Sequence, residues 1–419
     1  MPDIEAINAV AAGDIEAVNA VAKANIETIN GVGIATSGAT YWAICFDDQE
    51  TSWAAHADIA SEAEWATNVW TTHGSSGSVD TIDIAYGKDG SGNGIFAVIA
   101  NSSGNNTWMD QNNDITDGSS WSRQNIPSSA KRQTIAWGND VWVSAGNVSG
   151  SNVNIHRSTN GGGTWLAVDV SGATNINTSE KIEALASDGA GNWMFGQKAN
   201  LYFSSDDAAS WAWLIQPSGS SSDYIRDIIY TNGSWVVLYS AGGNANLIAC
   251  VGSTSANMDA SGDWGTAVTL TGEFSDGGTA IVDGDGDPVG DVTLNGTSSN
   301  RMAAAAGRIV VMQMGAGNAT SPWLAGSRTI GADVSAKVIT LDSSGTVQRV
   351  PFTAGTAQSI ATDGSTWLAG CDGSDTGRNG GEIARSTDGG DSWTLIVEGI
   401  DNATTNRVNG IAADVYLPL

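Results

Sequence analysis

Short apolar runs separated by polar turns follow one another along most of the chain. Each run is rich in β-branched and aromatic residues and is bounded by Gly, Asn, Asp or Ser, a pattern typical of short strands joined by tight turns. Another short strand precedes most of them, so each unit should contain four strands: two joined by a turn, a third after a loop, and a fourth after the tryptophan-ended segment described next. Seven such runs, often led by tryptophan, recur at 40–46, 94–100, 140–146, 191–197, 233–239, 307–313 and 365–371.

An octapeptide that ends in tryptophan follows most of these strands. Its clearest copies read STNGGGTW at 158–165, SSDDAASW at 204–211 and STDGGDSW at 386–393, so the consensus is S-x-D-x-G-x-T-W, called the box below. We predict that the acidic or amide residue binds the N–H groups of its own hairpin tip, and that the tryptophan packs against neighbouring strands. Looser or fainter copies end at Trp65, Trp121, Trp264 and Trp323. The residues assigned this structural role are Asn160, Trp165, Asp206, Trp211, Asp259, Trp264, Asp388 and Trp393.

The spacing of the boxes predicts the fold. Successive box tryptophans lie 44 to 70 residues apart, and a unit of four short antiparallel strands at such a period is typical of a β-propeller. The repeat therefore predicts an all-β protein with seven blades of four strands over residues 36–419. The first unit lacks its innermost strand. We predict that a strand within 408–419 pairs with residues near 41–47 and closes the ring, which removes exposed strand edges.

Composition and charge narrow the function. With 53 Gly and 17 Trp but 41% hydrophobic residues, the chain is turn-rich and not disordered. Its net charge of −28 disfavours nucleic acid as a partner. No long apolar run or signal-peptide pattern occurs, so membrane insertion is not expected. Cys45, Cys250 and Cys371 lie in apolar runs and are predicted to be buried free thiols of a protein folded in a reducing cytoplasm.

Residues 1–35 carry a different repeat, of 11 residues: DIEAINAVAAG, DIEAVNAVAKA and NIETINGVGIA. Its apolar residues recur at helical spacing, which predicts an α-helix over 3–30 that ends at Asn30-Gly31. This helix could pack on its own propeller. Alternatively, it could be a coiled-coil stalk that joins three chains, and the threefold repetition of the stripe favours this homotrimer.

The boxes resemble Asp-box (BNR) motifs, found in sialidases, xyloglucan-cleaving hydrolases, sortilin-like receptors and the photosystem II assembly propeller. The resemblance implies the fold and says little about activity. Of the sialidase signature only Arg349-Val350-Pro351 has a counterpart, and it comes after most boxes instead of before them. No catalytic residue can be assigned, so the sequence favours a protein that is not an enzyme. A glycoside hydrolase with two carboxylates stays open, as does an assembly factor of the photosystem II type.

The N-terminal repeat carries a second resemblance. The segment NIETINGV at 25–32 resembles repeats of virion structural and tail-fibre proteins of tailed bacteriophages. This resemblance implies a virion component, made in the host cytoplasm, that docks on other virion proteins through its N-terminus. The propeller would then be displayed on a tail or capsid appendage and would bind host cell-surface glycan or protein.

One acidic segment departs from the repeat. In VDGDGDPVGD at 282–291, Asp283, Asp285 and Asp287 alternate with other residues, as oxygen ligands of Ca²⁺ loops often do. Pro288 occupies the place of the glycine in an EF-hand loop, so an acidic hairpin without metal is the competing interpretation. No other cofactor is expected, and no ligand-binding residue can be named.

Overall fold

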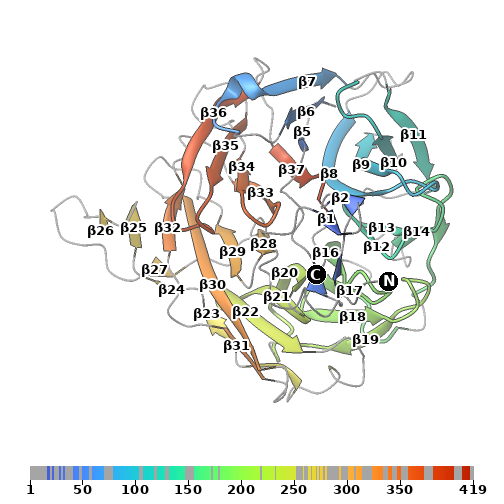
Figure 1. The fold of residues 1–419 in the computed structure, drawn as a ribbon. Coiled ribbons are helices and arrows are strands. Elements are labelled where there is room, and N and C mark those ends of the chain that lie inside the picture. Colours follow the sequence, from blue (N-terminus) through green and yellow to red (C-terminus); the bar gives the residue numbers. More distant parts are fainter. Residues whose placement is uncertain are drawn as a thin grey trace.

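The protein was analysed as a computed structural model, in which the strands form a ring (Figure 1). Short pieces between 17 and 33 and between 258 and 293 are also described. The main described ranges are 41–46, 50–55, 59–69, 79–102, 107–117, 120–127, 132–146, 155–170, 173–177, 180–217, 219–231, 233–251, 301–305, 308–313, 323–333, 338–341, 347–350, 357–371, 381–400 and 408–415.

Six antiparallel sheets of four strands make up most of the described ring, and each is numbered here as a blade. Blade 1 runs β37 (Val408–Ala413), β5 (Tyr41–Phe46), β6 (Glu50–Ala55) and β7 (Trp65–Val69), with the 3-10 helix η4 (Glu62–Glu64) before β7. Blade 2 runs β8 (Val79–Lys88), β9 (Gly94–Ser102), β10 (Thr107–Asn112) and β11 (Ser122–Ile126). Blade 3 runs β12 (Arg132–Gly138), β13 (Val141–Gly146), β14 (Ile155–Ser158) and β15 (Leu166–Ala167). Blade 4 runs β16 (Ile182–Ser187), β17 (Trp193–Gln197), β18 (Asn200–Ser204) and β19 (Ala212–Ile215). Blade 5 runs β20 (Tyr224–Thr231), β21 (Ser234–Ala241), β22 (Asn244–Val251) and β23 (Val268–Thr269). Blade 6 runs β33 (Ala357–Thr362), β34 (Trp367–Cys371), β35 (Gly381–Ser386) and β36 (Thr394–Ile400).

A larger, mixed sheet lies between blades 5 and 6. Its strands are, in spatial order, β28 (Arg301–Ala305), β29 (Arg308–Gln313), β30 (Trp323–Asp333), β32 (Val347–Val350), β25 (Phe274–Asp276) and β26 (Thr279–Ala280), with β31 (Val338–Leu341) on β30. A separate pair joins β24 (Thr271–Gly272) to β27 (Val292–Thr293). β25 pairs with β32 in parallel, and β30 is long enough to pair with both β31 and β32.

The prediction of seven four-stranded blades is therefore wrong in its count. All seven predicted apolar strands exist, as β5, β9, β13, β17, β21, β29 and β34, but β29 belongs to the larger sheet. The box of that unit, AGNATSPW, lacks the Ser and Gly of the consensus, and the strand that starts at Trp323 is longer than the equivalent strands of the blades.

The predicted closure of the ring by the C-terminal strand is confirmed. β37 pairs with β5 in antiparallel register, with Ile411 opposite Ile44 and Ala413 opposite Trp42. The innermost strands then follow one another around the axis, each packed beside the next: β37, β8, β12, β16, β20, β28 and β33.

The predicted N-terminal helix is not found among the described residues of this segment. The described pieces of this segment are two pairs of short strands, β1 (Ala17–Val18) with β2 (Val21–Ala22) and β3 (Thr28–Ile29) with β4 (Val32–Gly33). Ile29 lies opposite Val32, so Asn30-Gly31 connects the second pair. Asn-Gly between apolar residues is a strong hairpin signal, and Val, Ile and Thr favour strands, so these local preferences outweigh the 11-residue period. The remainder of the predicted helix lies outside the described residues.

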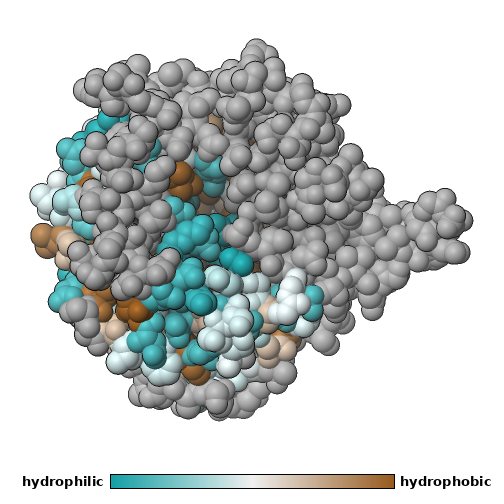
Figure 2. All heavy atoms as spheres, turned by 180° about the vertical axis from the view of Figure 1, so that it is seen from behind, coloured by the Kyte–Doolittle hydropathy of each residue, from teal (hydrophilic) through white to brown (hydrophobic). Residues whose placement is uncertain are grey.

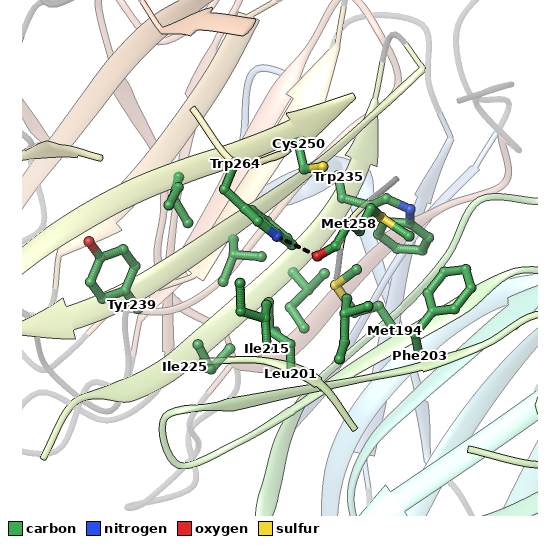
Figure 3. Close-up of a cluster of buried hydrophobic side chains, with 14 of the residues drawn as sticks. Met194, Leu201, Phe203, Ile215, Ile225, Trp235, Tyr239, Cys250, Met258 and Trp264 are labelled. Atoms are coloured by element: carbon green, nitrogen blue, oxygen red, sulfur yellow. Dashed lines mark hydrogen bonds between the residues drawn. The ribbon is translucent and has the colours of Figure 1, made fainter. Parts of the chain in front are cut away.

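The box tryptophans join each blade to the one before it. Trp165 of blade 3 packs with Ile95 and Met109 of blade 2, and Trp264, which follows β22 of blade 5, packs with Phe203 of blade 4. Figure 3 shows the second of these clusters, where the indole N–H of Trp264 donates to the carbonyl of Met258 at 2.9 Å. Trp211 is likewise buried, against residues of blade 3. Trp65, Trp121 and Trp393 are partly buried against the preceding sheet in the same way.

Three box loops share one hydrogen-bond pattern, in which the third residue of the box is the acceptor. In the second loop, Ser204 Oγ donates to Asp206 Oδ1 at 2.7 Å and accepts from the Ala208 N–H, while the Ser210 N–H donates to Asp206 Oδ1 at 2.9 Å. Asn160 and Asp388 accept the corresponding bonds in the other loops. Asp259 lies outside the described residues.

The two residues after this acceptor adopt left-handed backbone conformations in all three loops. In two loops both are glycines, with φ of 67° and 88° at Gly161 and Gly162, whereas Asp207 and Ala208 adopt 58° and 61° without that freedom. The hydrogen bonds of the loop at 204–211 thus stabilise a left-handed backbone conformation that Asp207 and Ala208 disfavour.

Asp206→Ala should lower the free energy of unfolding by about 1–3 kcal/mol, because the Ser210 N–H and two hydroxyls lose their acceptor. Asp206→Asn keeps the Oδ1 acceptor, as Asn160 does in the first loop, and should lose less than half as much. Chemical denaturation of the three proteins measures this. Equal losses for Ala and Asn would show that the acceptor is unimportant.

Two further features concern the cysteines and the length of the helices. Cys45, Cys250 and Cys371 are buried free thiols, as predicted. Among the described residues, no helix has the length and apolar character needed to cross a membrane.

Candidate functional site

A cavity of about 200 Å³ lies on the propeller axis, between the innermost strands. Six of these strands, β8, β12, β16, β20, β33 and β37, have an irregular register at the same point, where one residue bulges out of the pairing. Bulges re-aim side chains and are frequent next to functional sites. The bulges of β8, β12, β16 and β37 bring Ile82, Gln133, Glu183 and Asn409 to the cavity wall. The axial cavity is therefore the first candidate site.

Two aspartates follow these bulges and bridge neighbouring sheets in the same way. Asp83 of β8 accepts the Ile135 N–H at 3.0 Å and the Thr134 hydroxyl at 3.1 Å through Oδ2, both from β12 of the next blade. Asp227 of β20 accepts the Met302 N–H of β28 at 2.8 Å through Oδ2. Each Oδ1 accepts the N–H of the following residue, Ile84 or Ile228, at 2.9 Å.

The environment of these carboxyls raises their pKa values. Burial among the innermost strands raises the pKa of Asp83 and of Asp227 to about 6, and the hydrogen bonds and the positive charge of Arg301 offset only part of this effect. Both carboxyls are therefore partly protonated near neutral pH. Such values suit a general acid, but they also arise in structural carboxyls held between sheets.

A third carboxylate of the cavity is held in an ion-pair network. Glu183 of β16 lies 3.4 Å from Nη1 of Arg226 and 2.5 Å from Nζ of Lys181. Arg301 Nη1 in turn donates to the main-chain carbonyl of Arg226 at 3.4 Å. Arg226 thus connects blade 5 to blade 4, and Arg301 connects the larger sheet to blade 5, beside the cavity.

A second concavity lies at the outer edge of blade 4. This groove, of about 460 Å³, is lined by Asn175, Ile176, Asn177, Asn200, Trp213, Gln216 and Ser221. Trp213 is 37% exposed, and it and Leu166 are the large apolar side chains exposed in the described part of the chain. Hydrophilic residues predominate in the described part of the face in Figure 2.

The residues singled out from the sequence lie elsewhere. The described box residues form hydrogen bonds at hairpin tips or pack between blades. None of them lines the axial cavity or the groove. Asp283, Asp285 and Asp287 lie outside the described residues, so a Ca²⁺ site there stays a prediction. Within the described ranges, no cluster of three or more His, Cys, Asp or Glu residues is arranged to hold a metal ion.

Sequence reasoning missed Asp83 and Asp227, although both occur in a repeated pattern. The strands TIDIAY at 81–86 and YIRDIIY at 224–230 share D-I-x-Y, in which a carboxylate interrupts an otherwise strand-like run. An acidic residue at the same place in two innermost strands was the available signal.

Comparison with known protein families and with curated proteins finds no match. Among solved structures, the chain is similar to YCF48 bound to a D1 peptide, at 12% identity over 79% of this chain and 89% of that one, with a TM-score of 0.41. It is also similar to a GH74 xyloglucanase from Xanthomonas campestris, at 14% identity over 86% of this chain and 44% of that one, with a TM-score of 0.36. A Dyadobacter fermentans protein of unknown function shares 11% identity over 75% of this chain and 93% of that one, with a TM-score of 0.40. The propeller assignment rests on the sheet topology, and these likenesses do not assign a function.

The raised pKa values predict an unusual pH dependence. Asp83 and Asp227 have pKa values of about 6 in the folded chain and 3.8 as the reference, so between these values the folded state binds more protons than the unfolded state. The contribution of these carboxyls to the free energy of unfolding is therefore fully present at low pH and falls as pH rises from about 4 to 6. The loss should be on the order of 2 kcal/mol per carboxyl, after allowance for solvent in the cavity.

The free energy of unfolding should accordingly be higher at pH 5 than at pH 7. Lower net negative charge also contributes, so the control is the double variant Asp83→Asn/Asp227→Asn, in which the difference should shrink. Burial alone would raise the pKa of Asp206, but hydrogen bonds from Ser210 and Ser204 hold it below 3.8, so this carboxylate does not titrate in that window. Identical pH slopes in both proteins would contradict the assignment.

Proposed function

We propose that this chain is a non-enzymatic binding propeller of a tailed-bacteriophage virion, carried on a tail fibre, tail or capsid appendage. Its N-terminal segment would attach to other virion proteins, and its propeller would bind glycan or protein on the host surface. Three copies joined through residues 3–30 would strengthen weak contacts by avidity.

The observation that supports binding over catalysis is the engagement of the cavity carboxylates. Both oxygens of Asp83 and of Asp227 accept backbone N–H groups, and one N–H in each case comes from a neighbouring sheet. Glu183 is ion-paired on two sides. A glycosidase needs two carboxyls that face the scissile bond, whereas these hold adjacent sheets together.

The support for a virion lies in the sequence. The NIETINGV segment at 25–32 resembles phage structural repeats, and the net charge of −28 suits a protein displayed in salt solution. Peptides of this chain should therefore be enriched in density-banded tailed particles from the source of the sequence, and antibody against the chain should label a tail or capsid appendage. Recovery of the peptides only from the cellular fraction would overturn the assignment.

The number of copies has a separate test. Light scattering of the full chain should give three times the mass of one chain, and a variant that lacks residues 1–35 should give one. A full chain with the mass of one copy would remove the trimer from the proposal.

Glycan hydrolysis is the second candidate, because Asp83 and Asp227 share one cavity and both have a pKa of about 6. An active hydrolase would release reducing ends from a bacterial surface polysaccharide and would lose this activity in Asp83→Asn and Asp227→Asn. We expect no release by the wild-type protein. Release that both variants abolish would replace the binding proposal.

A further inference from the structure

The groove at the edge of blade 4 is built from uncharged side chains around one exposed aromatic ring. Asn200 begins β18, Trp213 lies on β19, Asn175 and Asn177 precede β16, and Gln216 follows β19. All its lining residues are neutral, although the chain carries 45 acidic residues and a net charge of −28. An uncharged groove on so acidic a protein selects for a ligand without charge.

The Trp213 ring is held in place while its surface is partly open. Its indole N–H donates to Asn200 Oδ1 at 3.2 Å, and its backbone pairs with Tyr202, a buried residue of β18. The aromatic ring is thus pre-oriented, so little side-chain entropy is lost when a ligand stacks on it.

The Asn175 and Asn177 side of the groove is hydrogen-bonded to a buried side chain. Gln197, which is fully buried, accepts the Asn177 N–H at 2.9 Å and donates to the carbonyls of Asn177 and Glu180 at 2.8 and 2.9 Å. The next wall residue, Ile176, packs against the core between blades 3 and 4. The Asn175 and Asn177 wall is therefore a rigid part of the fold.

One polar atom of the groove has no protein partner. The amide nitrogen Nε2 of Gln216 is buried, and no described residue accepts a hydrogen bond from it. Asn and Gln amides both donate and accept, as sugar hydroxyls do, so they match a polyhydroxylated ligand. An apolar ligand would leave Gln216 Nε2 unpaired, and an apolar protein segment would find only one aromatic anchor.

We propose that this groove binds a neutral oligosaccharide, with a sugar ring stacked on Trp213 and its hydroxyls bound by the surrounding amides. The volume of about 460 Å³ lies within the range of small-molecule sites, roughly 300–1,000 Å³. The inference rests on the proposed function for its setting, since it names the chemical class of the host-surface ligand. It does not require the axial cavity or the N-terminal segment.

Calorimetric titration of the full chain with neutral hexaoses (cellohexaose, maltohexaose, mannohexaose and chitohexaose) tests the proposal. At least one should bind in the micromolar to millimolar range. Trp213→Ala should weaken that binding at least tenfold, and Trp213→Phe less. Leu166→Ala is the matched control, because Leu166 is 66% exposed but does not line the groove. It should leave the affinity unchanged, and thermal melts should show all variants folded.

Two outcomes would overturn the inference: no binding of any of the four oligosaccharides at millimolar concentration, or equal binding by Trp213→Ala and the wild-type protein. Tighter binding of an anionic glycan such as polygalacturonate would also contradict it. These results are independent of particle fractionation, so a sugar-binding protein absent from virions would refute the virion assignment alone. Conversely, a virion protein that binds no neutral sugar would refute only the groove assignment.

Discussion

Removal of residues 408–419 is expected to unfold the propeller as a whole. β37 is the innermost strand of blade 1, and without it one edge of β5, with its fully buried Trp42 and Ile44, loses its partner strand. The same strand bonds to both neighbouring sheets: Asn409 Nδ2 donates to the Thr81 carbonyl at 2.5 Å, and Ser359 Oγ donates to the Val408 carbonyl at 3.3 Å. The loss should exceed about 5 kcal/mol, which is comparable to the whole stability of many domains.

The measurement is denaturant unfolding of any soluble product, together with its recovery after expression. A truncation of 416–419 alone leaves β37 in place and should behave like the full chain. A chain lacking 408–419 that stays soluble and melts within a few degrees of the full chain would contradict closure through β37.

Trp235→Ala is expected to lower the free energy of unfolding by about 3–5 kcal/mol. Trp235 on β21 is fully buried and packs edge-on against Phe203 of blade 4, with 6.4 Å between ring centroids (Figure 3). It also packs edge-on against Tyr230, at 4.9 Å between ring centroids. Its removal leaves a cavity between two blades that rigid strands cannot collapse to fill.

Two further variants calibrate this effect. Trp235→Phe should lose less, because most of the aromatic volume remains. Trp213→Ala removes the same side chain from a position that is 37% exposed, and it should lower the free energy of unfolding clearly less than Trp235→Ala does. Equal losses at 213 and 235 would show that burial between blades does not set the cost.

The repeated strands were predictable because each is specified by local pattern. Seven apolar runs became strands, and the spare strand at 408–413 closes the ring. Two predictions failed where local pattern was ambiguous or degenerate. At 28–33, Asn30-Gly31 favoured a strand pair over the 11-residue helical period. Near 316–323, loss of the Ser and Gly of the box coincided with a longer strand and a larger sheet.

The candidate sites could not be predicted in the same way, because they depend on contacts between distant parts of the chain. Asp83 binds the N–H of a residue 52 positions later, and Asp227 one 75 positions later. The partners become visible only when neighbouring blades are placed. In the groove, Trp213 resembled the other 16 tryptophans in sequence, and only its exposure distinguishes it from those that pack between blades.

The pairing of Ile44 with Ile411 has a kinetic consequence. These residues are 367 positions apart, so the first blade stays incomplete until almost the whole chain has left the ribosome. Loop-closure entropy makes such a long-range contact slow to form, and the unpaired edge of β5 is exposed to other nascent chains in the meantime. Blades 2 to 5, whose strands are consecutive in sequence, can form during synthesis. The last step of folding is therefore the joining of the two ends, and its rate sets how long each new molecule is vulnerable to aggregation.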